Sequence, residues 1–283
     1  MNYRHAFHAG NFADVVKHTV LTRIVVYLKR KDKAFRVIDT HAGAGIYDLS
    51  SDQAQRTGEW RSGIGRLIEA KLDEKTRSLF IPLLDSVASV NESGASSRYP
   101  GSPAILRHLL RKQDRLTAIE LHPEDAALLR QVFAGDHQVR VIELDGWLAL
   151  GAHVPPKEKR GLVVVDPPFE KPGEFDRMLE SLKKAHRRWP GGIYAFWYPI
   201  KNRTAVAAFR EALAQSGIPD ILDVSLEIRR STEERFDGSG MIVVNPPYLL
   251  RQELDLLLPT LAKILGDNAP GSFAIDQLTP ERS

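Results

Sequence analysis

Residues 161–198 read GLVVVDPPFEKPGEFDRMLESLKKAHRRWPGGIYAFWY. The β-branched run at 161–166 predicts a buried strand, the apolar spacing over 174–188 predicts a helix, and 191–198 predicts a second strand. The connection between the two strands is long enough for a parallel crossover. Repeated units of this kind are typical of an α/β protein with a mostly parallel, doubly wound sheet.

The same alternation extends over most of the chain and predicts seven strands in all. Further strands are expected at 35–40, 116–121, 138–144, 221–228 and 240–245, and further helices at 11–30, 103–112, 123–134, 203–215 and 251–265. Asn11 is expected to cap the first helix. The turn YPGSP at 99–103 predicts a helix start with Ser102 as N-cap and Pro103 at the first helical position, and a cap alone is its simplest interpretation.

Residues 48–99 interrupt this alternation, because they separate the first strand from the second far more widely than a crossover requires. Their pattern is polar and largely helical, as in GEWRSGIGRLIEAKL and EKTRSLFIPLLDSVASV. We expect a helical subdomain inserted into a sheet domain formed by residues 1–47 and 100–283. The alternative is a pair of covering helices with no role of their own.

Two Pro-Pro motifs follow strands, DPPF at 166–169 and NPPY at 245–248. Asp166 ends a strand that enters a parallel crossover, so it should lie at the carboxyl edge of the sheet, where open α/β sheets bind ligands. The strand before Asn245 follows its predecessor after only residues 229–239, which contain an Asp-Gly turn signal and no helix. We therefore expect an antiparallel last strand, a chemical role for DPPF and a structural role for NPPY.

An acidic residue or a glycine turn ends each of four successive strands. The first strand runs into DTHAGAG, whose Gly43 and Gly45 let the backbone approach a ligand closely. An acid after the second strand can accept hydrogen bonds from ribose hydroxyls. The four strand ends are the glycine turn, Glu120, Asp145-Gly146 and Asp166. Together they predict a nucleoside-containing ligand at this edge.

The chain has a net charge of +3 and an isoelectric point near 9.0, which is compatible with a nucleic-acid partner. Its basic clusters, KRKDK at 29–33 and KKAHRR at 183–188, are interpreted as solvated helix faces unless they share a face with a pocket. No apolar run approaches the roughly 18 residues that span a bilayer, and the first residues lack an apolar signal-peptide core. Without cysteine there are no disulfides and no thiolate ligands. We expect a cytoplasmic monomer with neither a membrane nor a metal as partner.

Several stretches together resemble the RlmJ family of Rossmann-like, S-adenosylmethionine-dependent methyltransferases. They are YRHAFHAGNFADVVKHTVL (3–21), DTHAGAG (39–45), YPGSP (99–103), ELHP (120–123), DPPF (166–169) and AFWYP (195–199). That family methylates the N6 atom of one adenine in 23S ribosomal RNA. The resemblance implies the same fold, S-adenosylmethionine as cofactor and 23S ribosomal RNA as partner.

The resemblance also implies roles for individual residues. The N-terminal tail would help to close the pocket, with Tyr3 near the substrate. The residues placed at the cofactor are Lys17, His18, His41, Gly43, Ser102, Glu120, Asp145, Gly146 and the catalytic Asp166. The plain alternative for Lys17 and His18 is that both are surface or packing residues of an amphipathic helix.

The DPPF motif suits an exocyclic amine, whose lone pair is delocalised into the adenine ring. Asp166 and the backbone carbonyl of Pro167 can accept hydrogen bonds from its two N–H groups, which favours localisation of the lone pair on nitrogen. Phe169, where the family more often has tyrosine, keeps the ring that can stack on a base taken out of its helix. The sequence thus assigns substrate contacts to Pro167 and Phe169.

Other functions stay open at this point. A methyltransferase could instead act on guanine N2, DNA adenine N6 or a protein glutamine amide, although the amide enzymes favour Asn-Pro-Pro-Tyr, which here follows the expected antiparallel strand. The incomplete glycine fingerprint disfavours a nucleotide-dependent oxidoreductase, and the intact DPPF disfavours a non-catalytic RNA-binding module. The histidines His5, His8, His18 and His41 lack the spacing of a metal site.

Overall fold

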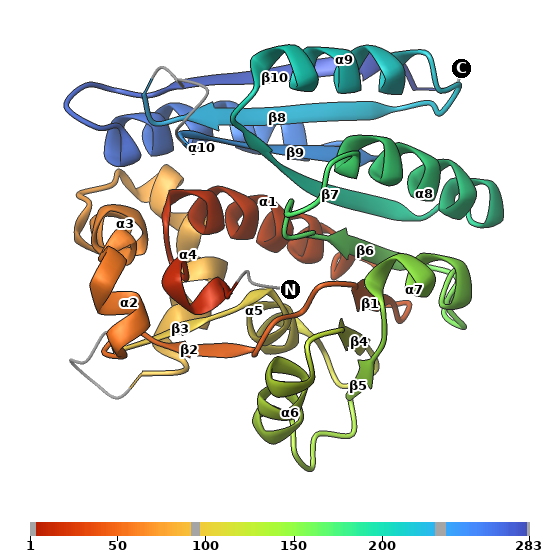
Figure 1. Cartoon of the computed structure of the whole chain (residues 1–283), viewed down its shortest axis with the longest axis horizontal. Helices are drawn as coiled ribbons and strands as arrows, with labels where there is room; N and C mark the ends of the chain where they lie inside the picture. The colour runs from red at the N-terminus through yellow and green to blue at the C-terminus, as the bar shows by residue number, and fades with distance from the viewer. Residues whose placement is uncertain (1–3, 92–96, 230–235, 282–283) are drawn as a thin grey trace.

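The computed structural model describes residues 4–91, 97–229 and 236–281. Within these ranges, eight strands form one sheet in the order β10-β8-β9-β7-β6-β1-β4-β5 (Figure 1). Their bounds are β1 (Arg36–Asp39), β4 (Arg115–Glu120), β5 (Val139–Glu143), β6 (Gly161–Val165), β7 (Ile193–Ile200), β8 (Ile221–Glu227), β9 (Gly238–Val244) and β10 (Ser272–Thr279). The five neighbouring strands β7, β6, β1, β4 and β5 run parallel to one another. β9 is antiparallel to β7 and β8, and β10 is antiparallel to β8.

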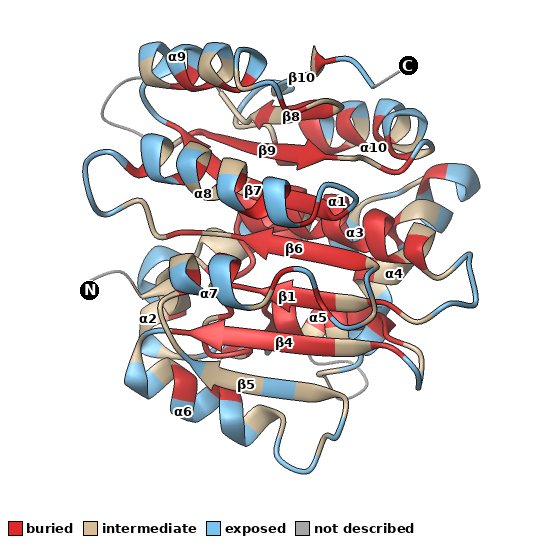
Figure 2. Ribbon diagram, turned by 90° about the vertical axis from the view of Figure 1, so that its right-hand side faces the viewer, coloured by how far each residue is buried: buried red, intermediate tan, exposed pale blue. Residues whose placement is uncertain are grey.

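The mostly parallel α/β sheet and its antiparallel β9 are confirmed, but the predicted number of seven strands is one too few. The additional strand, β10, lies at an edge of the sheet, and most of its residues are half-buried or exposed. Its sequence therefore lacks the apolar run that marks β6, in which every residue is buried (Figure 2).

Helices cover both faces of the sheet (Figure 1). One apolar core contains side chains of α1 (Phe12–Leu28), α4 (Glu74–Ala88), α5 (Ser102–Leu109), α6 (Pro123–Val132) and α10 (Leu250–Leu265). The core on the other face contains side chains of α7 (Gly146–Ala152), α8 (Glu174–Arg188) and α9 (Arg203–Ala214). The fold thus has three layers, with helices on each side of one sheet, and such sheets bind ligands at the carboxyl ends of their parallel strands.

Helix α1 is buried on nearly all sides, because it contacts β9 and also α4, α5 and α10. Asn11 caps it as predicted, accepting a hydrogen bond from the backbone N–H of Asp14 at 3.0 Å. Lys17 and His18 are both buried within it, so of the plain alternative, surface or packing residues, only the surface half is wrong. A buried lysine needs a compensating partner.

The segment between β1 and α5 is mainly helical, as expected, but it also contains a short ribbon. Its elements are β2 (Ile46–Asp48), α2 (Asp52–Thr57), η2 (Arg61–Gly65), α3 (Arg66–Glu69), α4 and β3 (Arg98–Pro100), with η1 (His5–Phe7) preceding α1. β2 and β3 pair antiparallel and join the two ends of the segment, with Tyr47 opposite Tyr99. Phe80 and Leu83 of α4 pack in the same core as α1. The division into a sheet domain and an inserted subdomain stays a prediction.

The NPPY motif lies at the amino edge of the parallel strands. The Asn245 side chain donates hydrogen bonds to the carbonyl oxygens of Pro190 and Gly192, at 2.8 and 2.7 Å, just before β7 begins. Its contacts are therefore those of a strand connection, on the opposite edge from Asp166. No helix in the described part of the chain combines the length and apolar character that a membrane crossing requires.

Candidate functional site

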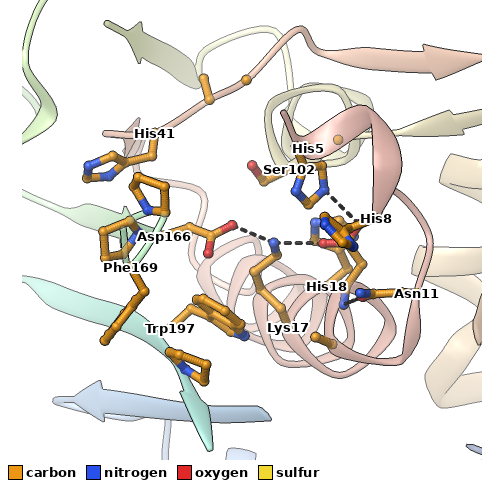
Figure 3. A pocket seen from close by; sticks show the side chains of 18 of the residues that line it. His5, His8, Asn11, Lys17, His18, His41, Ser102, Asp166, Phe169 and Trp197 are labelled. Atoms are coloured by element: carbon orange, nitrogen blue, oxygen red, sulfur yellow. Dashed lines mark hydrogen bonds and ion pairs between the residues drawn. The ribbon is translucent and has the colours of Figure 1, made fainter. Parts of the chain in front are cut away.

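The carboxyl ends of β1, β4, β6 and β7 surround one cavity, which α1 and the residues before it close from the side (Figure 3). Most of the predicted site residues line it, namely Lys17, His18, His41, Gly43, Ser102, Glu120, Asp166, Pro167 and Phe169. Asp145 and Gly146 are not among its lining residues. Tyr3 lies outside the described residues, so its contact with a substrate stays a prediction.

Lys17 joins α1 to the DPPF motif. Its ammonium lies 2.5 Å from the carboxylate of Asp166 and 2.8 Å from that of Asp14, while only 4% of its side chain is exposed (Figure 3). Burial alone would lower the pKa of Lys17, but the two negative charges outweigh burial and raise that pKa. Lys17 therefore stays charged and holds one carboxylate oxygen of Asp166 in a fixed position.

Asp14 links Lys17 to the N-terminal segment. Its carboxylate accepts hydrogen bonds from the backbone N–H of Gly10 and from Nε2 of His5, both at 2.9 Å. Burial raises the pKa of Asp14, but His5 and Lys17 together outweigh it and hold the pKa well below its usual range. His5, Asp14, Lys17 and Asp166 thus form a continuous chain of polar contacts along one wall of the cavity.

The glycine turn is built around Glu120. The N–H of Gly43 donates to Oε2 of Glu120 at 2.8 Å, and the N–H of His122 donates to Oε1 at 2.7 Å. Gly43 has a φ of +61°, and a Cβ there would lie 2.1 Å from the hydroxyl of Tyr47. Only glycine fits this position. Burial raises the pKa of Glu120.

Ser102 is not the N-cap that the sequence suggests. Gly101 is the N-cap, and Ser102 is the first residue of α5. Its hydroxyl donates instead to the carboxylate of Asp39 at 2.7 Å. Asp39 is fully buried, and burial raises its pKa to about 7. The predicted cap is therefore wrong by one residue, and Pro103 is the second residue of the helix.

An aromatic wall lies beside Asp166. The ring of Phe169 meets that of Trp197 edge-on with centroids 5.9 Å apart, and Trp197 meets Phe236 at 6.0 Å. Phe169 has a φ of +49°. Such sparsely populated backbone conformations cluster at ligand-binding sites in proteins. The turn therefore holds Phe169 in an uncommon backbone conformation and places its ring at the cavity.

Asp145 and Gly146 lie next to residues that line the cavity and do not line it themselves. Asp145 caps α7 through the backbone N–H of Trp147 and lies 3.3 Å from Arg177. A Cβ at Gly146 would lie 2.2 Å from the carbonyl oxygen of Thr40. His41 packs on Trp147 with centroids 5.4 Å apart. The Asp145-Gly146 turn thus allows His41 to lie at the rim.

Two histidines of the cavity, the buried His18 and the half-buried His41, are neutral near pH 7. Burial lowers the pKa of His18 to about 3 and that of His41 to about 4. Nδ1 of His18 lies 2.7 Å from the hydroxyl of Tyr99. Within the described residues, no three side chains of the types that bind metals gather as a metal site would require.

Comparison with known families agrees with this geometry. A family model described as Ribosomal RNA large subunit methyltransferase D, RlmJ, matches residues 32–279 of the chain. The chain belongs to the RlmJ family. The matched range includes the glycine turn, Glu120 and the whole DPPF motif, which all contribute residues to the cavity.

RlmJ-family relatives resemble the chain over nearly its full length. Proteins named Ribosomal RNA large subunit methyltransferase J are 42% identical in Escherichia coli (strain K12) and 39% identical in Haemophilus influenzae. Each alignment covers 99% of this chain and 100% of the relative. A crystal structure of a Legionella pneumophila protein is 34% identical, covers 95% of this chain and 98% of that one, and superposes with a TM-score of 0.87.

Sequence patterns of this RlmJ-family chain did not single out three of the residues around Asp166. Asp14, Trp197 and Phe236 line the cavity, yet none of them ends a predicted parallel strand. Trp197 stands in the carboxyl half of β7, within the AFWYP stretch, and this stretch was the available signal. Asp14 had no such signal, since its partners come from the tail and from within α1.

Proposed function

We propose that this protein transfers a methyl group from S-adenosylmethionine to the N6 amine of an adenine in 23S ribosomal RNA. Membership of the RlmJ family and the names of the two full-length relatives support the reaction. The observation that carries the proposal is that Asp166 and Pro167 line the same cavity as the glycine turn and Glu120. One space therefore adjoins a nucleoside-binding edge and an amine-binding motif.

One side of the cavity suits S-adenosylmethionine, which supplies an activated methyl group when bound. Each carboxylate oxygen of Glu120 accepts one backbone N–H and keeps a lone pair with which to accept a ribose hydroxyl. Gly43 lets the backbone approach the ligand without a side chain in between. Lys17, His18, His41 and Ser102 complete the proposed cofactor contacts.

The other side suits an adenine amine. Lys17 engages Oδ2 of Asp166, so Oδ1 is available to accept one N–H of the amine. The carbonyl oxygen of Pro167 accepts a hydrogen bond from the second N–H of the amine, and the Phe169 ring stacks on the base. The fixed negative charge of Asp166 also stabilises the amine as it becomes cationic during transfer. Positioning of the amine thus supplies much of the rate.

Methyl transfer from labelled S-adenosylmethionine to 23S ribosomal RNA lacking the mark tests this function. We expect N6-methyladenosine as the labelled nucleoside after digestion. Asp166→Asn keeps the side chain's shape but puts an amide where a carboxylate acts, and we expect it to lower the rate at least about 100-fold. Asp176→Asn, on the helix after the motif, is the matched control and should retain activity. A different methylated nucleoside would contradict the acceptor, and no transfer to any RNA would contradict the activity.

A further inference from the structure

The edge of the sheet opposite the cavity is strongly basic. Four segments meet there, 29–36, 111–115, 157–160 and 187–188, and we call them the basic edge. They contain thirteen lysines and arginines and three carboxylates, whereas the whole chain has a net charge of +3, so the rest of the chain sums to −7. In Figure 2 the arrows of β4 and β6 point away from this edge, which therefore lies at the strands' amino ends. Both basic clusters of the sequence reach it.

Hydrogen bonds from arginine side chains to backbone carbonyl oxygens bring the segments together. Arg111 donates to the carbonyl oxygens of Lys29, Lys31 and Lys33 at 3.2, 2.9 and 3.2 Å. Arg160 donates to that of Lys33 at 2.9 Å. On the neighbouring helix, Nε of Arg188 donates to the carbonyl oxygen of Val154 at 3.1 Å, beside residues 157–160. The arrangement is held through the backbone, so the lysine side chains are not needed to maintain it.

Several lysines of the basic edge face solvent. The side chains of Lys31, Lys33, Lys112 and Lys159 are exposed, and none of them takes part in an ion pair within the described part of the chain. Thirteen positive charges against three carboxylates leave a net repulsion along the edge, and a polyanion relieves that repulsion. The edge therefore has the electrostatic character of a phosphate-binding surface.

An exposed aromatic ring adjoins these cations. Tyr248 of NPPY is 69% exposed, accepts a hydrogen bond from the guanidinium of Arg30 at 3.0 Å and meets the ring of Tyr27 at 5.6 Å. Cations beside an aromatic face are typical of surfaces that bind RNA backbone and stack an unpaired base. β6 spans five residues from this edge to Asp166, about 17 Å at the usual rise per residue, so one folded RNA can reach both.

We propose that the basic edge is a second RNA contact surface, which holds a part of the ribosomal RNA distant from the target adenine. The inference rests on the proposed function for the identity of the polyanion. Because the rest of the chain is net negative, this edge supplies most of the long-range attraction for RNA. It therefore governs affinity for a long RNA and leaves cofactor binding to the cavity.

A charge-reversed triple variant, Lys31→Glu/Lys33→Glu/Lys112→Glu, tests the inference by binding to a long 23S ribosomal RNA transcript. Its control, Lys71→Glu/Lys75→Glu/Lys263→Glu, changes the net charge equally at exposed lysines away from the edge. We expect the edge variant to bind at least tenfold more weakly than the control, with the slope of log affinity against log salt reduced by about 2 to 3. Affinity for S-adenosylmethionine should be unchanged in both.

Equal losses in the two variants, or no loss in the edge variant, would overturn the second surface. Binding is measured separately from methyl transfer, so the two proposals can fail independently. A wild-type protein that methylates no RNA would contradict the proposed function, while the comparison of edge and control variants still decides the role of the basic edge.

Discussion

Replacement of Lys17 by methionine removes the ammonium that lies between the buried carboxylate of Asp14 and the half-buried carboxylate of Asp166. Asp14 is only 2% exposed and is not readily rehydrated, whereas Asp166, at 15% exposed, lines the cavity. Loss of one partner of a buried ion pair costs about 3–5 kcal/mol. We expect Lys17→Met to lower the free energy of unfolding by that amount at pH 7, and methyl transfer to fall with it as Asp166 loses its fixed position.

The loss should depend on pH in a defined direction. In the wild type the pKa of Asp14 lies well below its usual range, so Asp14 stabilises the fold above the unfolded pKa of about 3.9 and loses that contribution as pH falls through the folded pKa. Without Lys17, Asp14 loses one of the groups that lower its pKa, so that pKa moves upward from its wild-type position and protonation relieves part of the penalty as pH falls. The difference from wild type should therefore be smaller at pH 5 than at pH 7.

Urea denaturation followed by circular dichroism at the two pH values measures both effects. Lys184→Met, at an exposed position of α8, is the control and should change stability by less than about 0.5 kcal/mol. The double variant Lys17→Met/Asp14→Asn removes one orphaned charge and should be more stable than Lys17→Met. A Lys17→Met protein as stable as wild type, or equally destabilised at both pH values, would refute the account of this ion pair.

Three further changes test other parts of the site. Burial raises the pKa of Asp39 to about 7, so its contribution to stability is complete below about pH 4 and is lost as pH rises through 7. Asp39→Asn should therefore make the free energy of unfolding, measured by urea denaturation, nearly independent of pH between 5 and 8. An unchanged pH profile would contradict this. Phe169→Leu should raise the KM for RNA about 5- to 150-fold through lost stacking, whereas Phe169→Tyr should not, and equal kinetics of the two would exclude stacking. Gly43→Ala would place a Cβ 2.1 Å from Tyr47 and should abolish S-adenosylmethionine binding in calorimetry, while Gly191→Ala, which meets nothing within 4 Å, should bind normally.

The inner fold could be predicted because its strands are fully buried. β6 and β7 carry continuous apolar runs bounded by turn residues, which is the pattern of a parallel strand covered on both faces. β10 could not be found in this way, since an edge strand with mostly half-buried or exposed residues resembles a loop in sequence. The strands β2 and β3, of three residues each, are too short for any periodicity.

The site was predictable only where strand ends define it. Asp166 and Glu120 follow parallel strands, and topology alone brings them to one edge. The partnership of Lys17 with Asp166 joins residues 149 positions apart, and a charged residue in a helical pattern is ordinarily exposed. Its burial depends on α1 being enclosed by α4 and α10, which no local pattern expresses.

A crystal structure with S-adenosylhomocysteine and adenosine monophosphate tests the central claim most directly. The account predicts the thioether sulfur beside the glycine turn, and the adenine N6 within about 3.2 Å of both the Asp166 carboxylate and the Pro167 carbonyl oxygen. An adenine bound with its amine turned away from these two acceptors, or a cofactor bound outside the edge formed by Gly43 and Glu120, would contradict it.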